Sequence, residues 1–307
     1  MRVDTFLHKH FRNHSPARLS RTATTGGVTL DDGAPVGPRR RVTEGDTFLV
    51  RLCDPPDWAE EAEDDPLDVL YEDPWLLAVH KPAGVICHPT GATTSGTLLN
   101  RIQAHLDRQA PRGLLSPGIV HRLDGATSGV LLTCKTGDAH AGVCWQFEDR
   151  QTRKAYLALV EGDVRPDAGC CSAPIGRRLD SALMTCGPNA RRAKRSRTDW
   201  QVLLRMGDAT LLRCDLHTGR NHQIRVHLAS LGHPVVGDAF YAADGGLKWP
   251  PGECPNPARR HALHAASLSF RHPITGAPLT VRCPPSDFDV LLAAYRSTTA
   301  AGPTSVT

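Results

Sequence analysis

Residues 118–133 run Gly118-Ile119-Val120-His121-Arg122-Leu123-Asp124-Gly125-Ala126-Thr127-Ser128-Gly129-Val130-Leu131-Leu132-Thr133. The apolar run at the end of this stretch predicts a buried strand. The polar, glycine-containing segment before it predicts a loop whose backbone passes close to a ligand. One carboxylate, Asp124, lies in the loop between the cation Arg122 and the hydroxyls of Thr127 and Ser128. An isolated Asp-Gly pair most often forms a turn in which the aspartate caps its own backbone, so the residues alone leave both interpretations open.

The wider sequence pattern of this loop favours a functional site over a purely structural turn. Residues 121–124 and 127–129 resemble the His-Arg-Leu-Asp-x-x-Thr-Ser-Gly motif of the RluA family of RNA pseudouridine synthases. Agreement at seven fixed positions arises by chance in well below roughly one chain in a hundred thousand. The resemblance implies that Asp124 is the catalytic carboxylate. It also implies that Arg122 holds the flipped-out nucleotide or fills the space it leaves, and that His121 contacts a phosphate.

Length and composition suit one large domain with a smaller module. The chain has 307 residues with 40% hydrophobic residues, and no apolar run is long enough to cross a bilayer. Residues 1–10 lack the apolar core of a signal peptide. The 10 cysteines are scattered without a Cys-x-x-Cys motif, which favours reduced thiols over zinc ligands or disulfides. We therefore expect a cytoplasmic protein that is not associated with membranes.

The charge is unevenly distributed although its net value is only +4. Residues 1–53 carry 9 Lys and Arg against 5 Asp and Glu, whereas residues 54–73 carry 10 acids and no base. The remainder has 27 bases and 17 acids, a net charge of +10. A basic body on both sides of an acidic connector is compatible with a polyanionic partner such as RNA.

The chain divides into four segments. Residues 1–53 resemble an S4 RNA-binding domain, although Thr22–Thr25 interrupt the expected second helix and Asp31 and Asp32 occupy a turn that would face RNA. Both an RNA-binding role and a degenerate module kept for packing remain open. Residues 54–70 form an acidic linker, residues 71–296 the synthase-like domain and residues 297–307 a polar tail.

Two further segments of the large domain resemble the same family. Lys81 begins a Lys-Pro-x-Gly segment and is a candidate phosphate contact. Tyr156 lies in Lys-x-Tyr-x-Ala-x-Val-x-Gly, where the family carries its active-site tyrosine, and would stack on a flipped-out uracil, worth about 1–3 kcal/mol. The implied fold class is α+β. We expect a mixed, mainly antiparallel sheet flanked by helices, with the small S4-like α+β domain in front.

A second long motif lies in residues 216–228. We predict a helix from about Asn221 to Leu231, with Arg225 resembling the arginine that pairs with the catalytic aspartate. The attraction between a carboxylate and an arginine about 4 Å away is about 4 kcal/mol at an effective dielectric constant near 20. We therefore expect Asp124 to be charged at neutral pH. The histidines at 217, 222 and 227 diverge around such a helix, which argues against a metal site. The basic residues Arg191, Arg192, Lys194 and Arg195 are candidate phosphate contacts at a sheet edge or loop mouth.

The function implied is an RNA pseudouridine synthase. We expect it to act on ribosomal or transfer RNA, as a monomer, without metal, nucleotide or other cofactor, because the sequence has no phosphate-binding loop, dinucleotide fingerprint or zinc spacing. One alternative is a non-catalytic RNA-binding protein that kept the fold, but Asp124, Tyr156 and Arg225 are all present. The other is a hydrolase, which would need a histidine beside Asp124 and a second acid.

Overall fold

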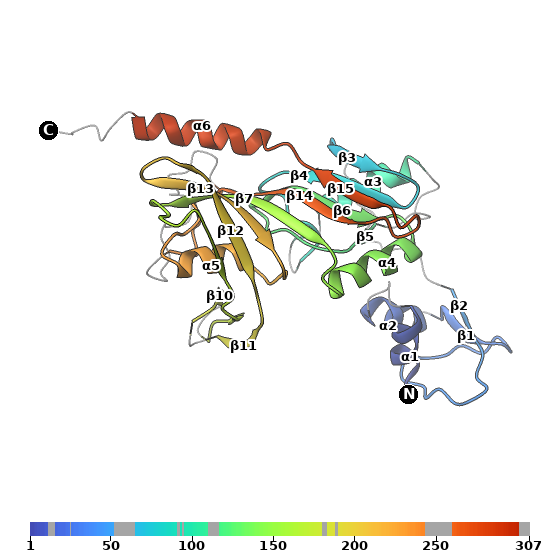
Figure 1. Ribbon diagram of the computed structural model, residues 1–307. Helices are drawn as coiled ribbons and strands as arrows, with labels where there is room; N and C mark the ends of the chain where they lie inside the picture. Colours follow the sequence, from blue (N-terminus) through green and yellow to red (C-terminus); the bar gives the residue numbers. More distant parts are fainter. Residues whose placement is uncertain are drawn as a thin grey trace.

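The computed structural model describes residues 1–11, 16–24, 26–51, 65–90, 93, 95–109, 117–179, 183–187, 190–242 and 260–300. One sheet of ten strands forms the body of this described part of the chain (Figure 1). In order across it, the strands are β3 (Val69–Glu72), β4 (Leu76–Lys81), β6 (Ser128–Cys134), β14 (Leu263–Arg271), β7 (Arg153–Glu161), β13 (Ala209–Leu216), β12 (Thr198–Arg205) and β8 (Ala168–Cys171), with β15 (Pro278–Arg282) paired to β14 and β5 (Gly118–Ile119) to β6.

The expected α+β class with a mixed, mainly antiparallel sheet is confirmed. Among the described strands, β6 and β14 pair in parallel, and the other neighbours in the sheet are antiparallel. The parallel pair requires a close backbone approach at Gly129, whose φ is +117°. A Cβ there would lie 2.2 Å from the carbonyl oxygen of Ala265. The glycine that closes the motif loop therefore lets the loop dock against β14.

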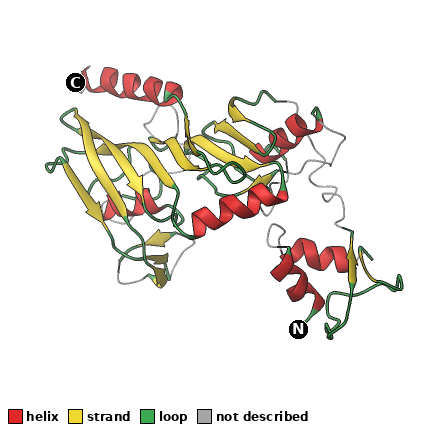
Figure 2. Ribbon diagram, turned by 45° about the vertical axis from the view of Figure 1, so that its right-hand side comes forward, coloured by secondary structure: helices red, strands yellow, loops and turns green. Residues whose placement is uncertain are grey.

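Alternating side chains bury both faces of the sheet. On β4 and β6, one face carries Leu77, Val79 and Leu131, which pack with α3 (Leu98–Asp107) in the larger core. The opposite face of the same strands packs with α4 (Gly137–Glu148) in a second core. The larger core also contains residues of α5 (Gln223–Ser230) and of α6 (Ser286–Ala300). Figure 2 shows these helices along the continuous sheet.

The N-terminal segment has a hydrophobic core of its own. It contains α1 (Val3–His10), α2 (Pro16–Thr24) and an antiparallel hairpin of β1 (Val28–Leu30) and β2 (Phe48–Val50) (Figure 1, blue). The expected interruption of the second helix at Thr22 is wrong, because α2 continues through Thr24. Ala23 is buried in the core and the Thr24 hydroxyl donates to the carbonyl of Ser20 at 2.8 Å. The S4 assignment stays a prediction.

A small three-stranded sheet carries the basic run. It consists of β9 (Ile175–Arg177), β10 (Met184–Thr185) and β11 (Arg191–Lys194), in the order β10-β9-β11. Ile175 packs with Val226 and Ala229 of α5 and with Tyr241, which anchors this sheet to the large domain. The basic residues of β11 are exposed on an edge strand, as the sequence predicts.

Two predicted boundaries differ from the structure. The helix expected from Asn221 begins at Gln223 because His222 adopts the left-handed conformation, with φ at 55°. Helix α4 begins after Thr136, its N-cap, whose hydroxyl accepts a hydrogen bond from the amide of Ala139. Helix α6 continues to Ala300, so the tail boundary at 297 falls within a helix. Most of the acidic linker lies outside the described residues. No helix in the described ranges is long and apolar enough to cross a membrane.

Candidate active site

The loop that carries Asp124 is fixed from several sides. Within it, the amide of Thr127 donates to the carbonyl of Asp124 at 3.0 Å. From β4, the ammonium of Lys81 donates to the carbonyl of Gly125 at 2.8 Å. From the segment before β14, Nε2 of His261 lies 2.8 Å from the hydroxyl of Thr127. These contacts hold the carboxylate on a rigid support.

Lys81 is therefore not the phosphate contact that the sequence predicted. Its side chain is fully buried. Besides Gly125, the ammonium donates to the carbonyls of Pro82 at 2.8 Å and Val85 at 2.6 Å. Three carbonyl acceptors satisfy its three donors. Lys81 therefore holds the backbone of the loop next to Asp124 in place.

A single guanidinium binds two carboxylates. Nη1 of Arg225 donates to Oδ2 of Asp124 at 2.9 Å, while Nε and Nη2 donate to the two oxygens of Asp238 at 2.6 and 2.8 Å. The side chains of Arg225 and Asp238 are 3% and 0% exposed, whereas that of Asp124 is 20% exposed. Burial alone would lower the pKa of Arg225, but the hydrogen bonds and charges of Asp238 and then Asp124 hold it above its ordinary value. The bidentate pair with Asp238 orients the guanidinium and leaves one nitrogen for Asp124.

The contact between Asp124 and Arg225 is the one expected from the sequence. The sequence did not indicate the residues that hold Arg225 in place, which are Asp238 and Tyr241. Asp238 follows α5 in the segment Val235-Val236-Gly237-Asp238, and an acid there was the available signal. The amides of Phe240 and Tyr241 donate to its Oδ1. The ring of Tyr241 lies 5.0 Å below the guanidinium carbon of Arg225. In the described part of the chain, no group of three or more His, Cys, Asp and Glu residues could hold a metal ion.

His222 also approaches Asp124. Its Nε2 lies 3.9 Å from Oδ1 of Asp124, and its Nδ1 lies 2.7 Å from the hydroxyl of Tyr241. That hydroxyl also accepts a hydrogen bond from the amide of Met184. Burial lowers the pKa of His222, so the ring is neutral at pH 7.

A cleft of about 430 Å³ opens above Asp124. Asp124, Arg225, Tyr156, Arg122 and His121 all line it. Arg122 is exposed at the wall of the cleft, as its expected role toward a nucleotide requires. The structure thus brings five predicted site residues into one cavity.

His121, for which the sequence predicted a contact with a phosphate, lines the cleft. Burial and the nearby Lys154 lower its pKa to about 3, so the ring is neutral at pH 7. Its Nε2 accepts the amide hydrogen of Leu132 at 2.9 Å. The ring stacks on Phe147 with a centroid distance of 5.3 Å. His121 therefore fixes the start of the loop against β6 and α4.

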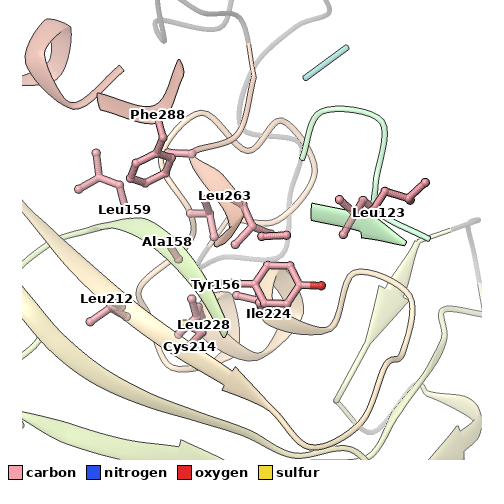
Figure 3. Close-up of a cluster of buried hydrophobic side chains, with 14 of the residues drawn as sticks. Leu123, Tyr156, Ala158, Leu159, Leu212, Cys214, Ile224, Leu228, Leu263 and Phe288 are labelled. Carbon is pink, nitrogen blue, oxygen red and sulfur yellow. The ribbon is translucent and has the colours of Figure 1, made fainter. Parts of the chain in front are cut away.

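Tyr156 lies at the junction of the core and the cleft. Its ring packs with Ile224 and Leu228 of α5, and Figure 3 shows its hydroxyl pointing away from Leu228 and Cys214. Burial, with a further contribution from Asp124, raises the pKa of Tyr156, so the phenol is protonated at neutral pH. The side chain presents a neutral aromatic surface to the cleft.

Replacement of Tyr156 separates stacking from proton chemistry. We expect Tyr156→Ala to lower kcat/KM about 5- to 150-fold, which corresponds to the loss of about 1–3 kcal/mol of base stacking. Tyr156→Phe keeps the ring and should retain most of the activity. Steady-state kinetics on an RNA substrate would measure both. A phenylalanine variant as inactive as the alanine variant would contradict the stacking role and assign the chemistry to the hydroxyl.

The predicted basic contacts divide between two surfaces next to the cleft. Arg191, Arg192 and Lys194 line a groove of about 890 Å³ that shares Gly219, Arg220 and Asn221 with the cleft. Arg195 instead lines a broader depression of about 1940 Å³, which shares Lys154 and Tyr156 with the cleft. Cationic surfaces therefore lead away from Asp124 in two directions, as a long polyanion would require.

The fold and the site together define an α+β enzyme with one guanidinium-bound carboxylate beside an aromatic ring in a basic cleft. The family model described as RNA pseudouridylate synthase matches residues 75–230, which include Asp124, Tyr156 and Arg225. The chain belongs to this family and is an RNA pseudouridine synthase.

Individual relatives agree with this assignment. The chain is 36% identical over 283 residues to the ribosomal large subunit pseudouridine synthase D of Zymomonas mobilis, covering 90% of this chain and 87% of the relative. It is 37% identical over 310 residues to the protein of the same description from Nitrosomonas europaea, covering 97% and 85%. The solved structure of human RNA pseudouridylate synthase domain containing 1 superposes with a TM-score of 0.58 at 27% identity, covering 78% of this chain and 97% of that chain.

Proposed function

We propose that this synthase isomerises specific uridines of large-subunit ribosomal RNA, and that Asp124 is its essential carboxylate. The observation that supports the role of Asp124 is its contact with Arg225 at 2.9 Å inside the cleft. The ribosomal substrate is supported by the relatives from Zymomonas mobilis and Nitrosomonas europaea, which are described as large-subunit enzymes.

The reaction requires one carboxylate in contact with a base that has left its stack. Pseudouridine formation breaks the bond from C1′ to N1, turns the uracil and joins C1′ to C5, while the proton on C5 is lost and N1 gains one. Asp124 is the group available to attack C1′, attack the base or remove a proton. A base inside a helix cannot reach it, so the nucleotide must flip into the cleft. Tyr156 then stacks on the uracil, and Arg122 holds the nucleotide or fills the space that it leaves.

The substrate is tested with unmodified transcripts. Purified protein is incubated with large-subunit ribosomal RNA and, separately, with bulk transfer RNA, both transcribed in vitro, and pseudouridine is located at single-nucleotide resolution. Formation at discrete positions of the ribosomal transcript supports the proposal. Formation in transfer RNA alone would replace ribosomal by transfer RNA as the substrate.

The hydrolase alternative fits the site less well. His222 does supply a histidine near Asp124, at 3.9 Å. Asp238, the second carboxylate bound by Arg225, has a fully buried side chain with both oxygens hydrogen-bonded. Asp238 therefore cannot meet a substrate in the cleft. A non-catalytic RNA-binding protein would not need the buried Arg225–Asp238 pair, which orients the guanidinium toward Asp124.

The N-terminal segment is proposed to bind RNA. Its core is made of residues 3–36 alone, with flanking side chains up to Val50, so it packs separately from the sheet domain. Deleting residues 1–53 should weaken RNA binding and flatten its salt dependence, because fewer counterions are released. Turnover at saturating RNA should change little, since Asp124 and the other predicted catalytic residues lie in the sheet domain. Titration of RNA against full-length and shortened proteins at several salt concentrations measures this, and equal affinities with parallel slopes would make the segment structural.

A further inference from the structure

Three cations of the cleft have no role in holding Asp124. They are Lys154 on β7, Arg220 in the loop before α5, and Arg150 after α4, and all line the cleft. Among the described residues, none of the three has a carboxylate within 4.0 Å. Three positive side chains that line one cleft without an anionic partner are a site that an anion would complete.

Lys154 is the innermost of these cations. It lies two residues before Tyr156 on β7, so both side chains point to the same side of the strand. Its ammonium is 5.8 Å from the centroid of the Phe147 ring. A Cβ on Gly219 would lie 3.5 Å from the same nitrogen, so the glycine brings the loop of Arg220 close to it. Burial and the charge of Arg220 lower the pKa of Lys154 to about 8, which reflects the absence of a counter-charge.

Arg150 adopts a backbone conformation that favours glycine. It follows the C-cap of α4 with φ at 59°. In the described ranges, the residues other than glycine with positive φ are Arg150, Arg192 and His222. All three line the cleft or the adjoining basic groove. A long cation kept where glycine would be more easily accommodated indicates that its side chain has a use at the cleft.

We propose that Lys154, Arg220 and Arg150 form a binding site for a backbone phosphate of the RNA next to the flipped uridine. The inference rests on the proposal that RNA occupies this cleft. The phosphate supplies the counter-charge that Lys154 and Arg220 lack, and it places the nucleotide so that its base lies between Tyr156 and Asp124. Phosphate contacts fix position and register without reading sequence, which suits a site that lies two residues from the stacking residue Tyr156 on the same strand.

The test is filter binding of in-vitro-transcribed, unmodified large-subunit ribosomal RNA at several NaCl concentrations. Lys154→Met should weaken binding about tenfold, as expected for one charge-assisted contact, and lower the salt slope by about 0.7–0.9. Arg150→Gly should weaken binding while the protein becomes no less stable, because glycine fits the backbone. Arg165→Met is the matched control, since Arg165 lies beyond the other end of β7 with a side chain that is 88% exposed.

A pH series isolates the contribution of Lys154. The affinity of the wild type for RNA should fall between pH 7 and pH 9. Lys154 loses its proton in this range, and the neutral amine no longer attracts the phosphate. The other charged or titratable side chains that line the cleft with it are His121, Arg122, Asp124, Glu148, Arg150, Tyr156, His217, Arg220, His222 and Arg225. Lys154→Arg keeps a positive charge throughout the range, so it should bind like wild type at pH 7 and remove most of the fall. This variant also avoids any folding defect of Lys154→Met.

Two outcomes would overturn the phosphate site. One is wild-type affinity and salt slope in Lys154→Met and Arg150→Gly; the other is an unchanged pH dependence in Lys154→Arg. Either result leaves the proposed function intact if these proteins still form pseudouridine. The proposed function would be contradicted by a different result, namely pseudouridine formation by a protein without the Asp124 carboxylate.

Discussion

Protein with Asp124→Asn should form no measurable pseudouridine, while its affinity for RNA changes less than about threefold. The asparagine keeps the size of the side chain and can still accept a hydrogen bond from Arg225, but it cannot act as a nucleophile or base. Affinity is distributed over many phosphate contacts and depends little on one carboxylate. The measurement is pseudouridine formed per enzyme on ribosomal RNA transcripts, together with filter binding on the same RNA.

A matched variant controls for the loss of one negative charge. Asp138 is exposed in the first turn of α4, and Asp138→Asn should retain full activity. If Asp124→Asn were as active as Asp138→Asn, the essential carboxylate would have to be another residue.

Arg225→Met should destabilise the protein by about 3–5 kcal/mol, because it leaves a buried carboxylate without its cation. That carboxylate is Asp238 rather than Asp124, since the side chain of Asp238 is 0% exposed and that of Asp124 is 20% exposed. Activity should fall as well, because Asp124 loses the donor that positions it. Urea denaturation of the wild type and the variant measures the loss of stability.

A second substitution identifies the partner that matters for stability. Adding Asp238→Asn to Arg225→Met should restore more stability than adding Asp124→Asn does, because only Asp238 is enclosed. Strictly additive effects of Arg225→Met and Asp238→Asn would show that the two do not interact.

The same pair gives a pH dependence of stability. Burial alone would raise the pKa of Asp238, but the hydrogen bonds and charge of Arg225 outweigh it and lower that pKa below 3.8. The contribution of the pair is therefore present above the unfolded-state pKa and is lost as pH falls. In Arg225→Met the largest opposing influence on the pKa of Asp238 is lost, so acidification should destabilise that variant less than the wild type.

Much of the central site could be predicted because local sequence determines it. The apolar run after Ser128 predicts the buried strand β6, and the glycine-containing segment before it predicts the loop of Asp124. The motif of residues 216–228 predicts helix α5 and, through the resemblance, the pairing of Arg225 with Asp124. These features depend on residues that are close in the chain, where spacing and side-chain type are sufficient.

The remaining features depend on contacts between distant segments. Lys81 resembles a surface cation at a strand end until β4 and the motif loop come together and enclose it among carbonyls. The hydrogen bonds of Asp238 to Arg225 form only when the segment after α5 folds back. The exposure of His121 likewise depends on Phe147 of α4. Sequence patterns do not report whether a charged side chain ends in water or in the core.

The central claim is that this cleft isomerises uridines of large-subunit ribosomal RNA through Asp124. The most direct test is pseudouridine mapping of all cellular RNA at single-nucleotide resolution in a strain lacking the gene, complemented with the wild type or with Asp124→Asn. We predict discrete positions in large-subunit ribosomal RNA that lose pseudouridine in the deletion strain, regain it with the wild type and remain uridine with Asp124→Asn. Restoration of the same positions by Asp124→Asn, or an unchanged map in the deletion strain, would contradict the claim.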